Sequence, residues 1–220
     1  MGGVSPRSVI GFDNGRVVRV EPPLDRDTAQ VMTLLREAVA ASGLSQAALA
    51  RALGTSAPRL STYITGDTQP SARFLVRARR LGHALGAAAS RGLMSAPVTA
   101  AAMRGYLLDD EVEWVWRMLL QGRDHLTAII EERDEVLLGA WEAEPGTVGS
   151  AEWDALLAAI VAHEVEGAGL DAPAWALRQP LPDPWMPEHP FLSPGRVRDQ
   201  TPDWLRRQNI FVPARDLVTA

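Results

Sequence analysis

The hydrophobic residues between positions 29 and 85 recur at the helical period, and they predict four helices in succession. The first is expected over 29–42 and the fourth over 71–85, with two shorter helices between them. Their apolar positions are, in chain order, Val31, Leu34, Leu35, Ala38 and Val39; Leu49, Ala50 and Leu53; Leu60, Tyr63 and Ile64; and Phe74, Leu75, Ala78 and Leu81. Four amphipathic helices in such close succession indicate a small helical bundle.

The two middle helices carry start and stop signals. Ser45 is a good N-cap for the first of them, and Gly54 suits its end because glycine adopts positive φ without steric cost. Thr55 and Ser56 offer a cap for the second helix, Pro58 falls in its first turn, and Gly66 ends it. A helix, a four-residue turn and a second helix are the sequence form of a helix-turn-helix, whose second helix lies in the DNA major groove.

Beyond position 98 the pattern predicts a second helical region. It extends over about 99–142 and is expected to break near Gly122 and Gly139, because glycine weakens helices. The run YLLDDEVEWVWRMLL within it is too apolar for one exposed face, which places it in a domain core or a subunit interface. A further helix is expected over 150–166, with Ser150 as its N-cap.

The segments outside these helices define the expected domain boundaries. Near the N-terminus, SVIGF and RVVRV flank Asp13-Asn14-Gly15, which predicts a β-hairpin with a two-residue turn or, alternatively, a partly ordered arm. Residues 87–97 are rich in small residues and predict a linker. The expected fold class is mainly α, divided into an N-terminal arm or hairpin (1–28), a helix-turn-helix domain (29–86), the linker (87–97) and an acidic, Trp-rich interaction or dimerisation domain (98–220).

Proline and tryptophan concentrate in the C-terminal half. Prolines recur over 167–202, interleaved with aromatic residues, and this segment is expected to lie on the folded body because disordered linkers are poor in aromatics. A short helix is expected to start at Asp203 and to be followed by the strand-like sequence NIFV. All seven Trp lie at or beyond position 114, where they form either a domain core or a partner surface.

The sequence LSQAALARALGTSAPRLSTYITG, at positions 44–66, and the proline that follows it resemble the Cro/C1 (Xre) family of DNA-binding domains. The residues that match the pattern of this family are Gln46, Leu49, Ala50, Leu53, Gly54, Ser61, Gly66 and Pro70. With its flanking helices the resemblance covers about residues 29–86. An ordinary helical hairpin is the alternative, because two short amphipathic helices are common in proteins.

The resemblance implies a set of DNA-contacting residues. Gln46 would donate its side-chain amide to a phosphate, which fixes the position of the domain without sequence preference. The positions that face bases in the resembled domains are Ser56, Ala57, Pro58, Arg59 and Thr62. Arg59 is the best specific contact among them, because its planar fork matches guanine O6 and N7. A phosphate contact or a surface ion pair is the alternative role of Arg59.

Charge is distributed unevenly along the chain. The formal net charge is −5, yet residues 29–85 carry seven Arg against two acids, and residues 98–166 carry fifteen acids against four Arg. A basic module beside an acidic one is consistent with one region that binds nucleic acid and another that does not. Four arginines of the basic module either contact the DNA backbone or lie on a solvated helix face, namely Arg73, Arg77, Arg79 and Arg80.

The sequence holds no pattern of a catalytic or metal site. The four His are scattered, there is no HExxH motif, phosphate-binding glycine loop or GxSxG motif, and there is no Cys. We therefore expect no enzymatic activity, no metal and no cofactor. The sequence also lacks a run of eighteen apolar residues and a signal-peptide core, which predicts a soluble, cytoplasmic protein without membrane contact.

These observations predict a sequence-specific DNA-binding repressor that binds a pseudo-palindromic operator as a homodimer. Xre-type modules fused to acidic domains resemble antitoxins, which neutralise a toxin and repress their own operon. The ending WLRRQNIFVPARDL is similar to that of regulators encoded beside nucleotidyltransferase-like toxins. A toxin encoded by a neighbouring gene would meet residues 98–166 with a basic surface. The alternatives are a free-standing repressor whose second domain dimerises or senses a small molecule, and a protein-interaction adaptor that no longer binds DNA.

Overall fold

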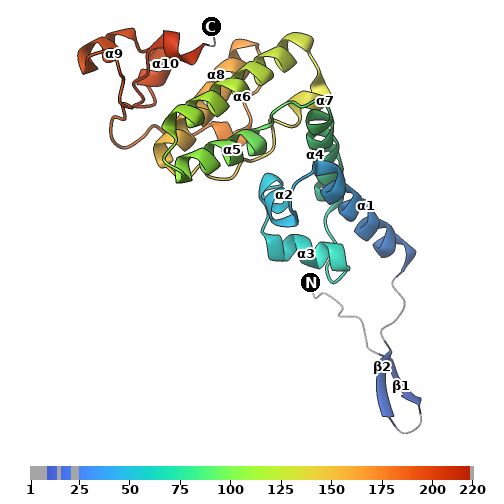
Figure 1. Cartoon of the computed structure of the whole chain (residues 1–220). Coiled ribbons are helices and arrows are strands. Elements are labelled where there is room, and N and C mark those ends of the chain that lie inside the picture. The colour runs from blue at the N-terminus through green and yellow to red at the C-terminus, as the bar shows by residue number, and fades with distance from the viewer. Residues whose placement is uncertain (1–8, 14–15, 21–24, 219–220) are drawn as a thin grey trace.

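The computed structural model describes residues 9–13, 16–20 and 25–218 of the chain. Strands β1 (Val9–Asp13) and β2 (Arg16–Val20) pair antiparallel, with Val9 opposite Val20 and Asp13 opposite Arg16 (Figure 1). This pairing agrees with the predicted hairpin, although its Asn14-Gly15 turn lies outside the described residues. The named elements that follow are helices, so the described part of the chain is mainly α, as predicted.

Four helices form the N-terminal bundle. They are α1 (Arg26–Ser42), α2 (Gln46–Ala52), α3 (Ala57–Thr65) and α4 (Ala72–Ser90). α1 and α4 lie side by side, with α2 and α3 to one side of them (Figure 1). The pair is close because α4 presents glycines to the backbone of α1. A Cβ on Gly82 would lie 2.6 Å from the carbonyl oxygen of Ala38, and Gly86 is similarly close to Ala41.

A second set of helices forms the C-terminal half. They are α5 (Ala96–Leu108), α6 (Val112–Glu132), α7 (Glu135–Leu138), α8 (Ala151–Gly167), α9 (Pro194–Gln200) and α10 (Asp203–Arg206), with short 3-10 turns η1 (Ala174–Ala176) and η2 (Ala214–Leu217). α5 and α6 form a helical hairpin, and α8 packs against α6 (Figure 1). None of the helices in the described residues is long and apolar enough to cross a bilayer.

The predicted helix break near Gly122 is wrong. α6 continues through Gly122, which is buried against Thr99 of α5, and a Cβ there would lie 2.7 Å from two side-chain atoms of Thr99. The glycine therefore permits close packing of two helices instead of ending one. The chain turns between Leu108 and Val112, where Asp110 has a φ of 60°, a conformation that Asp tolerates better than most residues.

Residues 87–97 differ from the flexible linker that their composition predicts. α4 continues to Ser90 and α5 begins at Ala96, so a short turn separates the two helices. Met94 within this turn is buried, and its backbone N–H donates to Nδ1 of His125 in α6 (2.9 Å). Ala88, Ser95 and Ala96 are buried where the helices pack closely, and composition alone does not distinguish close packing from flexibility.

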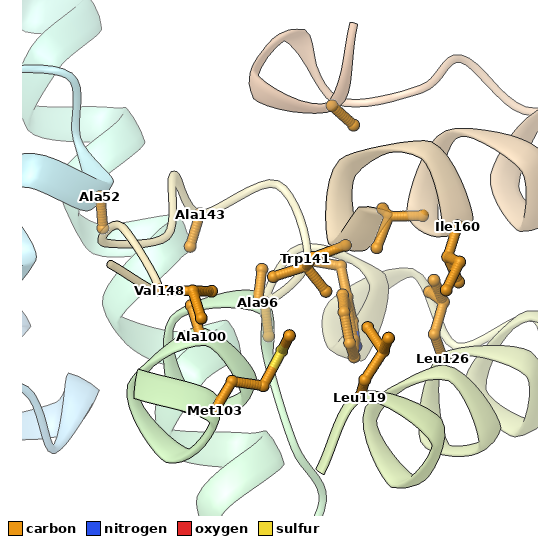
Figure 2. Packing of buried hydrophobic residues seen from close by; sticks show 14 of the residues in the cluster. Ala52, Ala96, Ala100, Met103, Leu119, Leu126, Trp141, Ala143, Val148 and Ile160 are labelled. Atoms are coloured by element: carbon orange, nitrogen blue, oxygen red, sulfur yellow. The ribbon is translucent and has the colours of Figure 1, made fainter. Parts of the chain in front are cut away.

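The loop between α7 and α8 packs against both the N-terminal bundle and the C-terminal half of the chain. Ala143 and Val148 of this loop are buried, and Figure 2 shows them between Ala52 of α2 and the α5 residues Ala100 and Met103. The buried apolar residues of both halves belong to one cluster. Because a shared core resists separate movement, the helix-turn-helix is held in a fixed position relative to the C-terminal half.

Polar contacts also join the N-terminal bundle to the loop between α7 and α8. Arg80 of α4 forms a bidentate ion pair with Glu142, with nitrogen–oxygen distances of 2.8 and 2.7 Å. The backbone N–H of Glu144 donates to the carbonyl oxygen of Ala52 at the end of α2 (3.4 Å). The Arg80–Glu142 pair is half exposed, so its contribution to stability is small, and burial of the apolar loop residues dominates the contact.

The proline-rich segment lies on the folded body, as predicted. Nε1 of Trp175 donates to the carbonyl oxygen of Trp141 (2.9 Å), and Trp185 forms a parallel bridge with the NIFV segment. Trp153 contacts both Trp116 and Trp185 edge to face, with ring centroids 5.0 and 5.3 Å apart. These aromatic contacts attach the C-terminal segment to α6 and α8.

Candidate nucleic-acid interface

The helix-turn-helix is built from local capping interactions. Oγ of Ser45 accepts the backbone N–H of Ala48 (3.2 Å), and Oγ of Ser56 accepts that of Arg59 (3.3 Å), so each serine caps the helix that the sequence assigned to it. Gly54 in the turn and Gly66 after α3 have φ values of 68° and 85°. Residues with a Cβ rarely adopt these angles, which explains the glycine at both positions.

Contacts from α1 and α4 hold α3 in place. Leu60 and Tyr63 are buried on its inner face, as the hydrophobic pattern predicts. Nη2 of Arg36 in α1 donates to the carbonyl oxygen of Ile64 (3.1 Å), which satisfies one of the free carbonyl groups at the end of α3. The ring of Tyr63 lies against Phe74 of α4, with centroids 5.1 Å apart. α3 is therefore a rigid element, as a base-contacting helix requires.

The structure places five of the six predicted DNA-contacting residues together, on α3 and its N-cap. They are Ser56, Ala57, Pro58, Arg59 and Thr62. The sixth, Gln46, is the first residue of α2 and is half-buried. Pro58 and Arg59 are exposed, whereas Ala57 and Thr62 are half-buried. Contacts between these residues and DNA stay a prediction.

Among the five residues on α3 and its N-cap, Arg59 has side-chain hydrogen-bond donors that other described residues do not occupy. Oγ of Ser56 is engaged in the cap, and Oγ1 of Thr62 donates to the carbonyl oxygen of Arg59 (2.9 Å). The guanidinium of Arg59 uses Nε to donate to the hydroxyl of Tyr63 (2.8 Å). Within the described residues, its two terminal nitrogens make no hydrogen bond or ion pair. The hydrophobic pattern placed Tyr63 in the core and did not indicate this contact, although residues four apart on a helix are neighbours.

The remaining arginines of the basic module fall into two groups. Arg73, Arg77 and Arg79 are exposed on α4, and none forms a hydrogen bond or ion pair with another described residue. Arg80 instead pairs with Glu142, and the hydrogen bond to this carboxylate raises the pKa of the Arg80 guanidinium. Arg80 therefore belongs to the contact between the N-terminal bundle and the C-terminal half, whereas the other three arginines of α4 present their charges to solvent.

Two short capped helices joined by a tight turn define a helix-turn-helix, a motif that suggests DNA binding through its second helix. Residues 32–91 match a family model described as a helix-turn-helix domain, which spans most of α1 and all of α2, α3 and α4. This match is consistent with a regulator of the Cro/C1 type. No curated protein and no solved structure matches the chain.

Proposed function

We propose that this chain is a transcriptional repressor that places α3 in the major groove of its operator and acts without catalysis. The observation that carries the proposal is the position of Arg59, which is exposed in the first turn of a capped helix and has two terminal nitrogens without partners in the described chain. These two nitrogens have the spacing that guanine O6 and N7 require. The exposed arginines of α4, namely Arg73, Arg77 and Arg79, supply the positive charge that draws such a helix to DNA.

The repressor is proposed to bind DNA as a homodimer. One helix-turn-helix contacts few base pairs, and discrimination among genomic sites grows when two copies occupy one operator. Two-fold pairing of this kind requires half-sites that are separated by one helical turn, roughly 10 base pairs. The operator of this protein is therefore expected to be pseudo-palindromic.

We also propose that the C-terminal half binds a partner protein and that the chain is the autoregulating antitoxin of a toxin–antitoxin pair. Residues 98–166 carry an excess of acids, which suits a basic partner. A groove of about 690 Å³, here called the α6 groove, lies between the start of α6 and the C-terminal segment. Its apolar lining residues include Val112, Trp116, Leu120, Phe191, Phe211 and Val212. Phe191 is 88% exposed, and an aromatic side chain this exposed beside an apolar groove is typical of an interaction surface.

The DNA-binding proposal is tested by selecting duplexes from a random pool with the full chain and measuring affinity for the enriched sequence by fluorescence anisotropy. Arg59→Ala should cost about 1–3 kcal/mol on the selected site and relax the preference at one base pair. Gln46→Ala should weaken binding to selected and unrelated duplexes alike, because a phosphate contact carries no sequence information. Unchanged specific affinity in Arg59→Ala would contradict the proposed placement of α3.

The antitoxin proposal is tested by expressing each gene next to this one alone and together with the full chain. One neighbour should arrest growth, and this chain should restore growth and co-purify with it in near-equal amounts. Phe191→Asp should abolish the rescue and leave operator binding unchanged. Absence of any toxic neighbour, with operator binding intact, would favour the free-standing repressor. Rescue without any DNA binding would favour the adaptor.

A further inference from the structure

Tyr63 presents its hydroxyl to the arginine that is proposed to contact bases. Nε of Arg59 donates to this hydroxyl at 2.8 Å, and the guanidinium carbon lies 5.9 Å from the Tyr63 ring centroid. We propose that Tyr63 is a positioning residue, which orients the guanidinium of Arg59 so that its two terminal nitrogens face a guanine. This inference rests on the proposed DNA binding and adds a residue that sets its sequence specificity.

The hydroxyl of Tyr63 is itself held in place. Tyr63 is 6% exposed, so its ring has no room to change rotamer without disturbing the core. The ring contacts Phe74 with centroids 5.1 Å apart and planes inclined at 59°, a favourable aromatic arrangement. Phe74 belongs to α4, whose N-cap Ser71 accepts its backbone N–H (3.2 Å). The position of the hydroxyl is therefore fixed by the core of the bundle and not by the surface.

A tyrosine hydroxyl is a suitable partner for an arginine that is to contact a base. A free arginine side chain samples many rotamers, and ordering them on binding costs entropy. The Tyr63 contact orders Arg59 in advance and uses only Nε, which leaves both terminal nitrogens for the two acceptors of guanine. A carboxylate in this place would order Arg59 too, but it would cancel the charge that attracts phosphates. A neutral hydroxyl preserves that charge.

Other polar groups on α3 do not offer the same support. Oγ of Ser56 accepts the backbone N–H of Arg59, and Oγ1 of Thr62 donates to the carbonyl oxygen of Arg59. Both hydroxyls contact the backbone of Arg59 and not its guanidinium. Within the described residues, Tyr63 is the hydrogen-bond partner of the Arg59 side chain. Loss of the one hydroxyl should consequently free the guanidinium.

The test uses the full chain and a duplex enriched from a random pool. Specificity is measured with the enriched duplex and with versions of it in which each G·C pair is changed in turn. It is the dissociation constant of the changed duplex divided by that of the enriched duplex. Tyr63→Phe should lower this ratio about three- to tenfold at the pair contacted by Arg59, the effect expected for one hydrogen bond. Affinity for an unrelated duplex should stay the same. The matched control is Tyr106→Phe, which removes the other tyrosine hydroxyl of the chain from α5.

A double-mutant comparison separates positioning from packing. In an Arg59→Lys background, which keeps the charge and loses the planar fork, Tyr63→Phe should have no further effect on the ratio. Thermal unfolding of each variant shows whether the bundle is intact. An unchanged ratio in Tyr63→Phe would overturn the proposal, and so would an equal loss of affinity for every duplex. Failure of the pool to yield an enriched sequence would instead refute sequence-specific binding, and the positioning role with it.

Discussion

The two halves of this chain reach their helical structure by different means. In the N-terminal bundle each helix begins at a residue whose side chain accepts a backbone N–H of the first turn, and these residues are Asp25, Ser45, Ser56 and Ser71. In the C-terminal half, α5, α6, α9 and α10 begin without such a side-chain cap. Their boundaries depend on tertiary packing, which local sequence signals describe poorly.

Aromatic contacts join the elements of the C-terminal half, where Asp134 and Ser150 cap α7 and α8 but four other helices have no side-chain cap. Trp153 in α8 contacts Trp116 in α6 on one side and Trp185 in the proline-rich segment on the other. His163 of α8 stacks on Trp204 of α10, with centroids 4.2 Å apart and nearly parallel planes. These pairs join residues far apart in the sequence. The N-terminal bundle is thus specified largely within each helix, and the C-terminal half between elements.

The largest expected effect comes from breaking this aromatic network at its centre. Trp153 is 6% exposed, and Trp153→Ala should lower the free energy of unfolding by about 3–5 kcal/mol, because truncation of a buried aromatic leaves a cavity. Urea unfolding measures this change. All seven Trp lie at or beyond position 114, so tryptophan emission reports on the C-terminal half and far-ultraviolet circular dichroism reports on both.

Trp114→Ala is the matched control for this prediction. Trp114 is 40% exposed, stacks on Tyr106 and lies beneath Arg117, so its removal should cost no more than about 1.5 kcal/mol. Equal costs for the two substitutions would show that the buried network does not hold the C-terminal half. Because both halves share one core, the emission and dichroism curves of the unmodified chain should coincide, and separated curves would show that the bundle folds alone.

The same contrast explains how much of the fold could be predicted. α2, α3 and α8 start where Ser45, Ser56 and Ser150 indicate, because each cap lies within a few residues of the groups it satisfies. The prediction at Gly122 failed because the same residue type breaks an isolated helix and permits close packing of two. The distinction depends on Thr99, which lies in another helix, and no pattern within α6 indicates it.

The candidate site shows the same limit. The hydrophobic pattern and the caps predicted α3 and its exposed Arg59, which are local features. The Arg59–Tyr63 hydrogen bond was accessible from their spacing of four residues but was missed, because Tyr63 also fits the core. The pairing of Arg80 with Glu142 joins residues 62 apart, and only the folded chain shows that this arginine is taken up by the contact between the halves.

An intermediate effect is expected where the N-terminal bundle depends on tertiary packing. Gly82→Ala should lower the free energy of unfolding by about 1–3 kcal/mol, because the new Cβ would collide with the backbone of Ala38 in α1. The control is Gly105→Ala in α5, where the new Cβ would meet no atom of the described chain within 4 Å apart from its own stretch of helix. That change should stabilise the chain by up to about 1 kcal/mol through helix propensity alone. Stabilisation by both substitutions in urea unfolding would show that α1 and α4 adjust freely.

The smallest expected effect concerns the cap of α1. Asp25 accepts the hydroxyl of Thr28 and the backbone N–H groups of Asp27 and Thr28, and these bonds, that from the Thr28 hydroxyl foremost, lower the pKa of its carboxyl below the ordinary value of 3.8. Because the folded-state pKa is the lower one, the stabilisation is fully present above pH 3.8. It is lost as the pH falls through the folded-state value.

Asp25→Asn keeps a capping oxygen and removes the charge, which isolates this electrostatic part of the cap. The variant should melt at a lower temperature than the unmodified chain at pH 7, and the gap should narrow as the pH is brought below 3.8. Asp27→Asn is the control. This substitution removes a charge from the same first turn, but the side chain of Asp27 does not cap the helix. A gap of constant size across this pH range would mean that the charge of Asp25 does not stabilise α1. The start of the N-terminal bundle would then depend on packing, as the C-terminal helices do.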